Sequence, residues 1–225
     1  MNEYLNELYV HAKKYEKQAA ETLLDYFNLS SKSKSKNYML AKAIIYSYEG
    51  ESIAKTKINF NNINVKTIQL RESGNPQEAM SFPCFDFCKI INESWETSSF
   101  RKFLERDFLF FVFKRTNGIN ILFKVMTWEV PLKDLDGEIK LVWEDTKSKI
   151  ANGNVIKKIE NGKVFTTFMP EKDTSICHVR PHGSNGSDLT LLPVSDIRTG
   201  YNHALKESFW FNHEYIKKII EEDGE

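Results

Sequence analysis

Asp134, Glu138 and Lys140 have the residue types and spacing of a magnesium-dependent nuclease centre. Such a centre needs two or three carboxylates to hold Mg²⁺, and usually a lysine that positions water or stabilises charge. The glutamate and lysine of a Glu-x-Lys pair share a face on a strand, where alternate residues point the same way. Here the surrounding pattern is helical, and residues two apart on a helix do not face each other. We therefore expect a solvated helix N-terminus rather than a metal site.

A second lysine, Lys66, lies in a segment whose apolar and polar residues alternate over 63–70, as in a half-buried strand. Two positions before it, where a nuclease strand would carry a carboxylate, the residue is Asn64. Lys57 stands upstream, where a second acid would be needed. On this chemistry alone, the strand does not hold Mg²⁺ by the nuclease pattern.

Three cysteines, Cys84, Cys88 and Cys177, are further candidates for metal chemistry. A zinc site made from them and His178 is conceivable, but a pair of Cys-x-x-Cys motifs is missing. The odd count is too small for a disulfide scaffold, so reduced thiols in a cytoplasmic protein are the simplest interpretation.

The elements that must position these residues alternate in type along the chain. Residues 1–27 have apolar residues at spacings of three and four, which predicts one N-terminal helix, and 28–36 form a polar, basic loop. Further helices are expected over 37–48, 98–106, 132–151 and 212–222, and strands over 63–70, 79–87, 108–113, 119–130, 164–169 and 175–179. The fold class is α/β or α+β, with a mixed central sheet flanked by helices in one domain, 1–225.

The charge balance at first argues against a nucleic-acid binder. The 225 residues contain 31 Lys plus Arg and 31 Asp plus Glu, so the formal net charge is zero, whereas nucleic-acid-binding domains are usually basic. The distribution is uneven, however, because eight cations and two anions lie between Ser30 and Arg71. A basic face is compatible with zero net charge. No long apolar run or signal peptide is visible, so we expect no membrane partner.

Five short motifs lie in order along the chain. They are NVKTI from Asn64, QEAMSF from Gln77, WETS from Trp95, CHVRPH from Cys177 and SFWFN from Ser208. In these motifs the chain resembles the MutH family of GATC-specific endonucleases, over about 35–220. The likeness is strongest to the C-terminal, non-catalytic domain of two-domain type II restriction enzymes of that family. The resemblance implies a restriction-endonuclease-like fold and a bacterial, cytoplasmic location.

The resemblance also implies that the nuclease centre is degenerate. The family's acidic positions fall at Ala43, Lys57 and Asn64, and of the catalytic set only Lys66 is retained. A cation and an amide in place of two carboxylates favour an anion such as phosphate and repel Mg²⁺. We therefore expect no catalytic residue, metal or cofactor in this chain, with Mg²⁺ used by the catalytic domain of the parent enzyme.

DNA-binding positions are better preserved in the resemblance. Arg180-Pro181-His182 matches an Arg-Pro-Lys string that reads bases, and arginine suits bidentate contact with guanine. Trp210 matches an aromatic position that the family uses near the target adenine. A surface salt bridge for Arg180 and core packing for Trp210 are the alternatives. Phe103 replaces a DNA-contacting lysine of the family. The expected DNA-binding residues are Lys34, Lys36, Lys66, Arg101, Arg180, Pro181, His182 and Trp210.

The first hypothesis is a domain that binds a GATC-type site in double-stranded DNA and activates a cutting domain. Its partners would be DNA, the N-terminal catalytic MutH-like domain of the same parent protein, and a second copy on DNA. Met1 would then not be the natural start. The second hypothesis is an active Mg²⁺-dependent endonuclease whose acids have moved, to Glu78 with Glu49 or Glu51. The third is a domain that serves dimerisation only.

Overall fold

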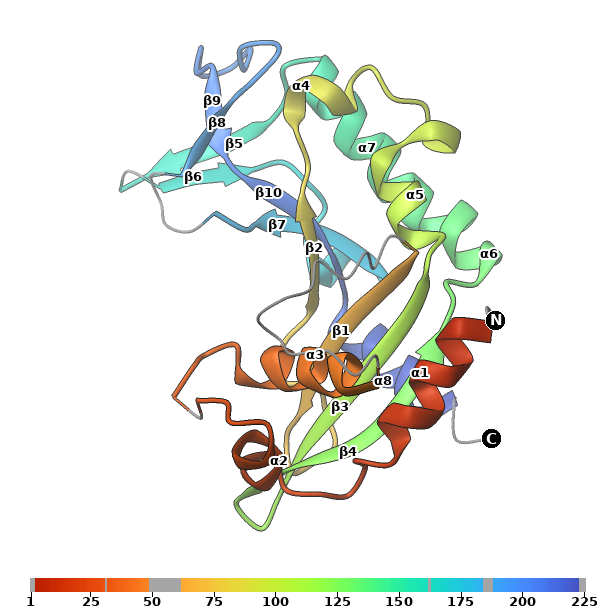
Figure 1. Cartoon of the computed structure of the whole chain (residues 1–225). Coiled ribbons are helices and arrows are strands. Elements are labelled where there is room, and N and C mark those ends of the chain that lie inside the picture. Colours follow the sequence, from red (N-terminus) through yellow and green to blue (C-terminus); the bar gives the residue numbers. More distant parts are fainter. Residues whose placement is uncertain (1–2, 31, 49–61, 162, 184–187, 223–225) are drawn as a thin grey trace. The chain divides into compact units, whose positions relative to one another are not determined.

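The computed structural model describes residues 3–30, 32–48, 62–161, 163–183 and 188–222. Its fold is a mixture of helices and small sheets (Figure 1), which confirms the predicted α+β class. The chain forms two compact units. Unit 1 comprises Met1–Glu78, Glu105–Glu129 and Asp223–Glu225, and unit 2 comprises Ala79–Leu104 and Val130–Glu222. The strands of the described residues are thus shared between two three-stranded sheets and two hairpins, where one central sheet was expected.

Unit 1 is built on the sheet β1-β3-β4, in which β1 (Ile63–Leu70) runs parallel to β3 (Asp107–Thr116), and β3 runs antiparallel to β4 (Ile119–Trp128). The apolar run at the centre of β3 is completely buried, as its lack of alternation predicts. Helices α1 (Glu3–Lys13) and α2 (Ala20–Tyr26) pack on β4, and α3 (Lys36–Tyr48) packs on β1. Their apolar residues form one core with the sheet.

The N-terminal segment forms two helices rather than the single helix expected over 1–27. The interruption lies at Lys17, whose φ of 64° is left-handed. The Lys17 amide donates to the Leu122 carbonyl at 2.7 Å, and Ala19 forms an isolated bridge with Ile121. Bonds to strand β4 therefore replace the helical bonds of this stretch.

Three amides tie the start of α3 to the sheet of unit 1. Asn37 donates to Gln69 at 3.0 Å, Gln69 donates to Asn120 at 3.0 Å, and Asn120 donates back to Asn37 at 3.3 Å. The three side chains come from α3, β1 and β4 and close a ring. This ring fixes the position of α3 over the strand that carries Asn64 and Lys66.

Unit 2 contains the antiparallel sheet β2-β10-β7, with β10 (Glu207–Phe211) between β2 (Met80–Cys84) and β7 (Cys177–Pro181). The strand predicted over 79–87 is thus shorter, and it pairs with a strand more than 120 residues later. Two hairpins complete its strands, β5 (Ile156–Glu160) with β6 (Lys163–Thr166) and β8 (Leu189–Leu191) with β9 (His203–Leu205). Aromatic rings of Phe82, Phe100, Phe209 and Phe211 contact one another in the core.

The helices of unit 2 are mostly short. They are α4 (Phe87–Ile90), α5 (Ser99–Leu104), α6 (Leu132–Asp134), α7 (Lys140–Ala151) and α8 (His213–Glu222), with single turns at η1 (Trp95–Thr97) and η3 (Glu171–Asp173). The helix expected over 132–151 is interrupted by a π turn, η2 (Leu135–Ile139), because Gly137 has a non-helical backbone with ψ of −116°. No helix among the described residues is both long and apolar enough to cross a membrane.

Candidate nucleic-acid interface

Strands β7 and β10 bring most of the predicted base-reading residues of unit 2 together. In their antiparallel register His178 lies opposite Trp210, and Arg180 lies opposite Ser208. Because side chains alternate along a strand and directly paired residues share a face, these four side chains lie on one face of the sheet. Pro181 is opposite Glu207 and therefore belongs to the other face.

The side chains on this face form a stack. The guanidinium carbon of Arg180 lies 3.8 Å from the centre of the Trp210 ring, and the His182 ring lies 4.8 Å from it. The Ser208 hydroxyl is 3.0 Å from Nδ1 of His182. Arg180 and His182 are exposed, whereas Trp210 is buried. A planar cation on an indole, with a second ring beside it, presents hydrogen-bond donors to solvent in a defined orientation.

His178 and Ser208 were not among the residues expected to bind DNA. The signal was present in the alternation of His178, Arg180 and His182, which places all three on one face of a strand. Nδ1 of His178 lies 2.7 Å from Oδ1 of Asn212, and burial lowers the pKa of the imidazole. A neutral ring is therefore favoured at this position.

The opposite face of the same sheet carries a buried carboxyl group. Glu207 is fully buried, and burial raises its pKa to about 8. The nearby Thr166 side chain lowers this pKa, but by less than burial raises it. Neither carboxylate oxygen has a partner in good hydrogen-bond geometry among the described residues. The carboxyl is therefore protonated at neutral pH.

Unit 1 holds the positions at which the resemblance to the family predicts a degenerate nuclease centre. Asn64 and Lys66 are two residues apart on β1 and share a face, and Ala43 lies on α3, which packs on β1. Ala43 and Asn64 are buried. Burial lowers the pKa of the half-buried Lys66 to about 8, because its charge is poorly solvated. Lys57 lies outside the described residues.

The basic loop of unit 1 and the first residue of α3 carry two of the expected DNA-binding residues. Lys34 is exposed, and Lys36 forms an ion pair with Glu21 at 3.1 Å. The side chain of Lys36 keeps 31% of its surface exposed. Lys34 is thus the more accessible cation of the two.

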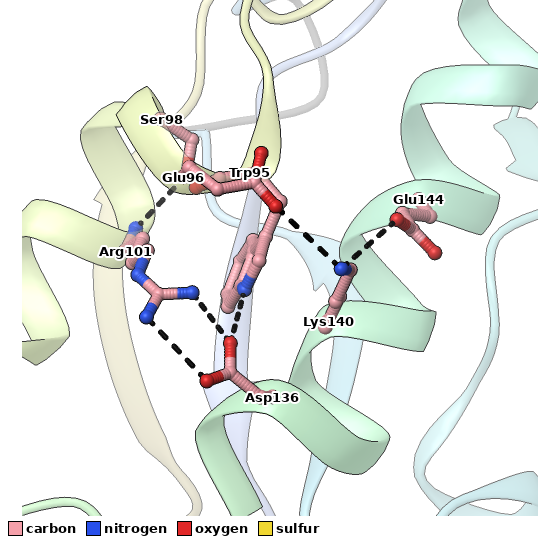
Figure 2. A network of polar contacts seen from close by, with 7 residues as sticks. All are labelled: Trp95, Glu96, Ser98, Arg101, Asp136, Lys140 and Glu144. Atoms are coloured by element: carbon pink, nitrogen blue, oxygen red, sulfur yellow. Dashed lines mark hydrogen bonds and ion pairs between the residues drawn. The ribbon is translucent and has the colours of Figure 1, made fainter. Parts of the chain in front are cut away.

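Arg101 is held within unit 2. Figure 2 shows its guanidinium and the Trp95 indole pointing at the same carboxylate, Asp136. The Arg101 Nη1 to Asp136 Oδ1 distance is 2.5 Å, and Trp95 Nε1 donates to the same oxygen at 2.8 Å. The Arg101 side chain is 16% exposed. Its role as a DNA contact stays a prediction, and phosphate would have to compete with Asp136 for it. The neighbouring Phe103 ring packs against Phe82.

Two comparisons with known proteins relate this sequence to one family. A family model described as the DNA mismatch repair enzyme MutH matches residues 46–131. The type II restriction enzyme Sau3AI of Staphylococcus aureus is 31% identical over 237 residues, which cover 90% of this chain and 48% of that enzyme. The chain belongs to the MutH-like family. It spans about half the length of the curated relative that it matches.

The possible nuclease motif of Asp134, Glu138 and Lys140 makes structural contacts in this MutH-like chain. Asp134 accepts a hydrogen bond from the Tyr215 hydroxyl at 2.8 Å. Glu138 accepts bonds from the amides of 175–177, and Lys140 lies between Glu96 and Glu144 (Figure 2) at 3.7 and 3.9 Å. The three residues thus have separate partners, and the π turn η2 lies between Asp134 and Lys140.

Other candidate metal ligands of the MutH-like chain are dispersed. Cys84 and Cys88 are exposed and Cys177 is buried. Cys177 and His178 are successive residues of β7, so their side chains point to opposite faces. Glu78 is exposed in the segment before β2, and its proposed partners Glu49 and Glu51 lie outside the described residues. Within the described ranges, no three His, Cys, Asp or Glu side chains gather in a way that could hold a metal ion.

Proposed function

We propose that this MutH-like chain recognises a GATC-type site in double-stranded DNA without cutting it, as the effector module of a type II restriction enzyme in the bacterial cytoplasm. The observation that carries the proposal is the exposed guanidinium of Arg180, held 3.8 Å above the Trp210 ring beside His182. Arginine can donate two parallel bonds to O6 and N7 of guanine. An arginine already oriented on an aromatic ring loses less freedom on binding than a mobile one.

The composition of β1 supports binding without cleavage. An amide and a cation, Asn64 and Lys66, share one face of β1, the face opposite to Ile63 and Val65 of the unit 1 core, so this strand offers a phosphate one positive charge and no carboxylate. Mg²⁺ prefers carboxylate oxygens, and a lysine ammonium near such a site opposes its binding. Lys66 would therefore hold a phosphate oxygen directly.

The length of the chain supports a partner in the same protein. It covers 48% of a restriction enzyme, which leaves room for a catalytic MutH-like module of similar size. An effector role means that DNA bound here raises the affinity or activity of that module for its own DNA, a coupling between two distinct sites. Self-association of two copies on DNA would be a second way to build such coupling.

The test uses the purified chain with a GATC duplex and a scrambled duplex, each with and without Mg²⁺, over a salt series. We expect tighter binding to the GATC duplex than to the scrambled duplex, and uncut DNA under every condition. Sedimentation of the complex reports whether one or two copies bind. Equal binding to both duplexes would contradict the recognition of a GATC-type site.

Variants separate the alternatives. Arg180→Ala should weaken binding to the GATC duplex by about 1–3 kcal/mol and reduce the preference over the scrambled duplex. Lys172→Ala, which removes an exposed cation from η3 of the same unit, should leave the preference unchanged. Cut or nicked DNA that disappears with Glu78→Ala would instead support an active nuclease with relocated acids.

A further inference from the structure

The hairpin of β5 and β6 carries most of its side chains outside the core of unit 2. Ile156, at its base, is completely buried, but every residue from Lys157 to Glu160 is exposed. Ile159 is 38% exposed, and Phe165 on the paired strand is 40% exposed. The hairpin projects at the left of unit 2 in Figure 1.

The hairpin is basic although the whole chain is neutral. Residues 156–166 contain three lysines and one glutamate, which gives this segment a formal net charge of +2. Lys158 lies opposite Phe165 in the strand register, and its Nζ is 4.9 Å from the centre of the Phe165 ring, which attracts the ammonium. Lys157 is the extra residue of a β-bulge, a feature that re-aims side chains. Two adjacent lysines are thus presented at the surface by specific backbone and ring contacts.

The base of the hairpin lies beside the strands of the candidate DNA-binding face. The Thr166 side chain, at the end of β6, lies next to the Glu207 carboxyl of β10. Met169, shortly after β6, accepts a hydrogen bond at 3.0 Å from the amide of Val179, the residue before Arg180. The hairpin and the strands that carry Arg180 are therefore joined at this point.

Asp196 attaches the other strand of the hairpin to the same part of unit 2. It is 1% exposed and lies between β8 and β9, in the segment that connects β7 to β10. Its Oδ2 accepts from the amides of Val155 at 3.0 Å and Ile156 at 2.7 Å, and the Arg198 guanidinium donates to the Ile156 carbonyl. Hydrogen bonds to a charged group are stronger than those between neutral groups. The hairpin is thus held in one direction relative to Arg180.

The length of the hairpin is sufficient to reach the DNA backbone from this base. A strand rises about 3.3 Å per residue, so Lys157 to Glu160 span about 13 Å. The major groove is about 12 Å wide, and each DNA strand carries one phosphate per about 3.4 Å of helix axis. A duplex whose major groove receives Arg180 therefore has phosphates within this distance, up to about four base pairs outside the contacted base.

We propose that the β5–β6 hairpin is a second DNA-contacting element, in which Lys157 and Lys158 bind backbone phosphates beside the recognised site. The lysine ammonium is a compact charge with three donors, which suits phosphate oxygens. The inference rests on the proposed function, since it extends the contact with DNA beyond the bases that Arg180 reads. Glu160 weakens this contact, because its Oε2 lies 2.6 Å from Nζ of Lys158 and competes with phosphate for the ammonium.

The experiment compares two GATC duplexes of equal length and sequence. In one of them, methylphosphonates, which carry no charge, replace the phosphates about two to six base pairs outside the site on both sides. The unmodified chain should bind the fully charged duplex more tightly. The double variant Lys157→Ala, Lys158→Ala should bind the two duplexes equally, and its slope of log affinity against log salt on the charged duplex should be lower by about 1–2. Unchanged affinity for the neutralised duplex would show that this variant is folded.

Lys218→Ala is the matched control for Lys158. The Lys218 side chain is 53% exposed and pairs with Glu222 at 3.6 Å, and the Lys158 side chain is 54% exposed and pairs with Glu160. Lys218 lies on α8 of the same unit. This control variant should keep the difference in affinity between the two duplexes.

Glu160→Gln tests the competition for Lys158 in the opposite direction. Removing the carboxylate charge should strengthen binding to the charged duplex and leave binding to the neutralised duplex unchanged. A gain in affinity that depends on the flanking phosphates does not arise from a damaged fold.

Three results would overturn the inference. They are equal affinity of the unmodified chain for the two duplexes, a double variant that still distinguishes them, and Glu160→Gln binding both as the unmodified chain does. The hairpin would then contact solvent or a protein partner instead of DNA. All three results can occur while the chain still prefers GATC over scrambled DNA, so they leave the proposed function standing. Loss of that preference in the unmodified chain would contradict the proposed function itself.

Discussion

Buried ionisable side chains give each unit a residue whose charge depends on pH near neutrality. Glu207 in unit 2 and Lys66 in unit 1 both have a pKa of about 8, displaced from opposite directions by the same cause, burial. Burial disfavours the charged form, so it raises the pKa of an acid and lowers the pKa of an amine. The two residues therefore make opposite contributions to stability as the pH changes.

Glu207→Gln should remove a pH dependence of stability. The carboxyl keeps its proton up to about pH 8 in the folded protein, but only up to 4.5 at its ordinary pKa. The folded state thus binds an extra proton between these values, and the stability of the unmodified chain falls as the pH rises from about 4.5 to 8. Above pH 8 the variant should be more stable by about 2–5 kcal/mol. Urea unfolding at several pH values measures this, with the exposed Glu214→Gln as the control. A parallel pH profile for both variants would show that Glu207 is not the cause.

Lys66→Met should stabilise the fold and weaken DNA binding. Because the pKa of Lys66 is lowered, the unfolded chain binds more protons between about pH 8 and 10.5, and stability rises with pH across that window. Below pH 8 the buried charge opposes folding, so Lys66→Met should gain about 1–3 kcal/mol at pH 7. If Lys66 holds a phosphate, DNA affinity of the unmodified chain should fall as the pH rises through 8, and the variant should lose that dependence. DNA titrations of the unmodified chain and of the variant at pH 7 and 9 measure this dependence. A variant that is stabilised yet binds DNA as well as before would show that Lys66 makes no phosphate contact.

The segment that contains the π turn η2 contacts several other elements of unit 2. Alternate residues of the segment carry the carboxylates Asp134, Asp136 and Glu138, and each binds a different element. Asp134 binds Tyr215 of α8, Asp136 binds Trp95 of η1 and Arg101 of α5, and Glu138 binds the chain that enters β7. A regular α-helix would separate these positions by 200°. The irregular backbone at Gly137 changes that geometry, in a kind of turn that is common at functional sites.

Glu138→Ala should destabilise the chain strongly. One carboxylate oxygen, Oε1, accepts from the amides of Ser175 at 2.8 Å, Ile176 at 2.5 Å and Cys177 at 3.3 Å. Removing it leaves these amides without a charged acceptor, at a cost of about 2–4 kcal/mol. Glu144→Ala is the control, because its ion pair with Lys140 is 3.9 Å long and half exposed, and should contribute less than about 0.5 kcal/mol. Chemical denaturation of both variants gives the comparison. Similar midpoints would mean that water replaces the Glu138 carboxylate.

At the scale of the whole molecule, zero net charge coexists with a basic segment in unit 1. Each lysine that neutralises a phosphate releases a counterion, which makes the affinity depend on salt. Lys34→Ala should lower the slope of log affinity against log salt by about 1 and leave the GATC preference unchanged. Lys36→Ala should lower the slope less, because Glu21 already neutralises Lys36. Titrations at four salt concentrations measure both slopes. A change in sequence preference would assign these lysines to base reading instead.

Local patterns in the sequence predicted the positions of helices and strands better than they predicted which strands pair. Strand β1 was confirmed at both ends, since its alternation and the following turn cluster are local signals. Strand β10 was missed because all five of its residues are buried, which removes the alternation. The pairing of β2 with β10 depends on segments far apart in the chain, and no local pattern encodes it.

The candidate interface was predictable in part for the same reason. Arg180, His182 and Trp210 were predicted from their motifs to contact DNA, and the structure brings their side chains together. Only the register of β7 on β10 shows that His178 and Ser208 lie on the same face as Arg180 and Trp210. The ion pair that holds Arg101 was invisible in the sequence, because Asp136 is 35 residues away and its direction depends on the π turn.

The spacing of the three carboxylates in the segment around η2 has a consequence for how the chain can change over evolution. Each carboxylate could be exchanged singly, with a loss confined to one neighbouring element. An inserted or deleted residue between Asp134 and Glu138 would turn the carboxylates beyond it away from their partners together. This short segment should therefore vary among relatives in its side chains far more readily than in its length.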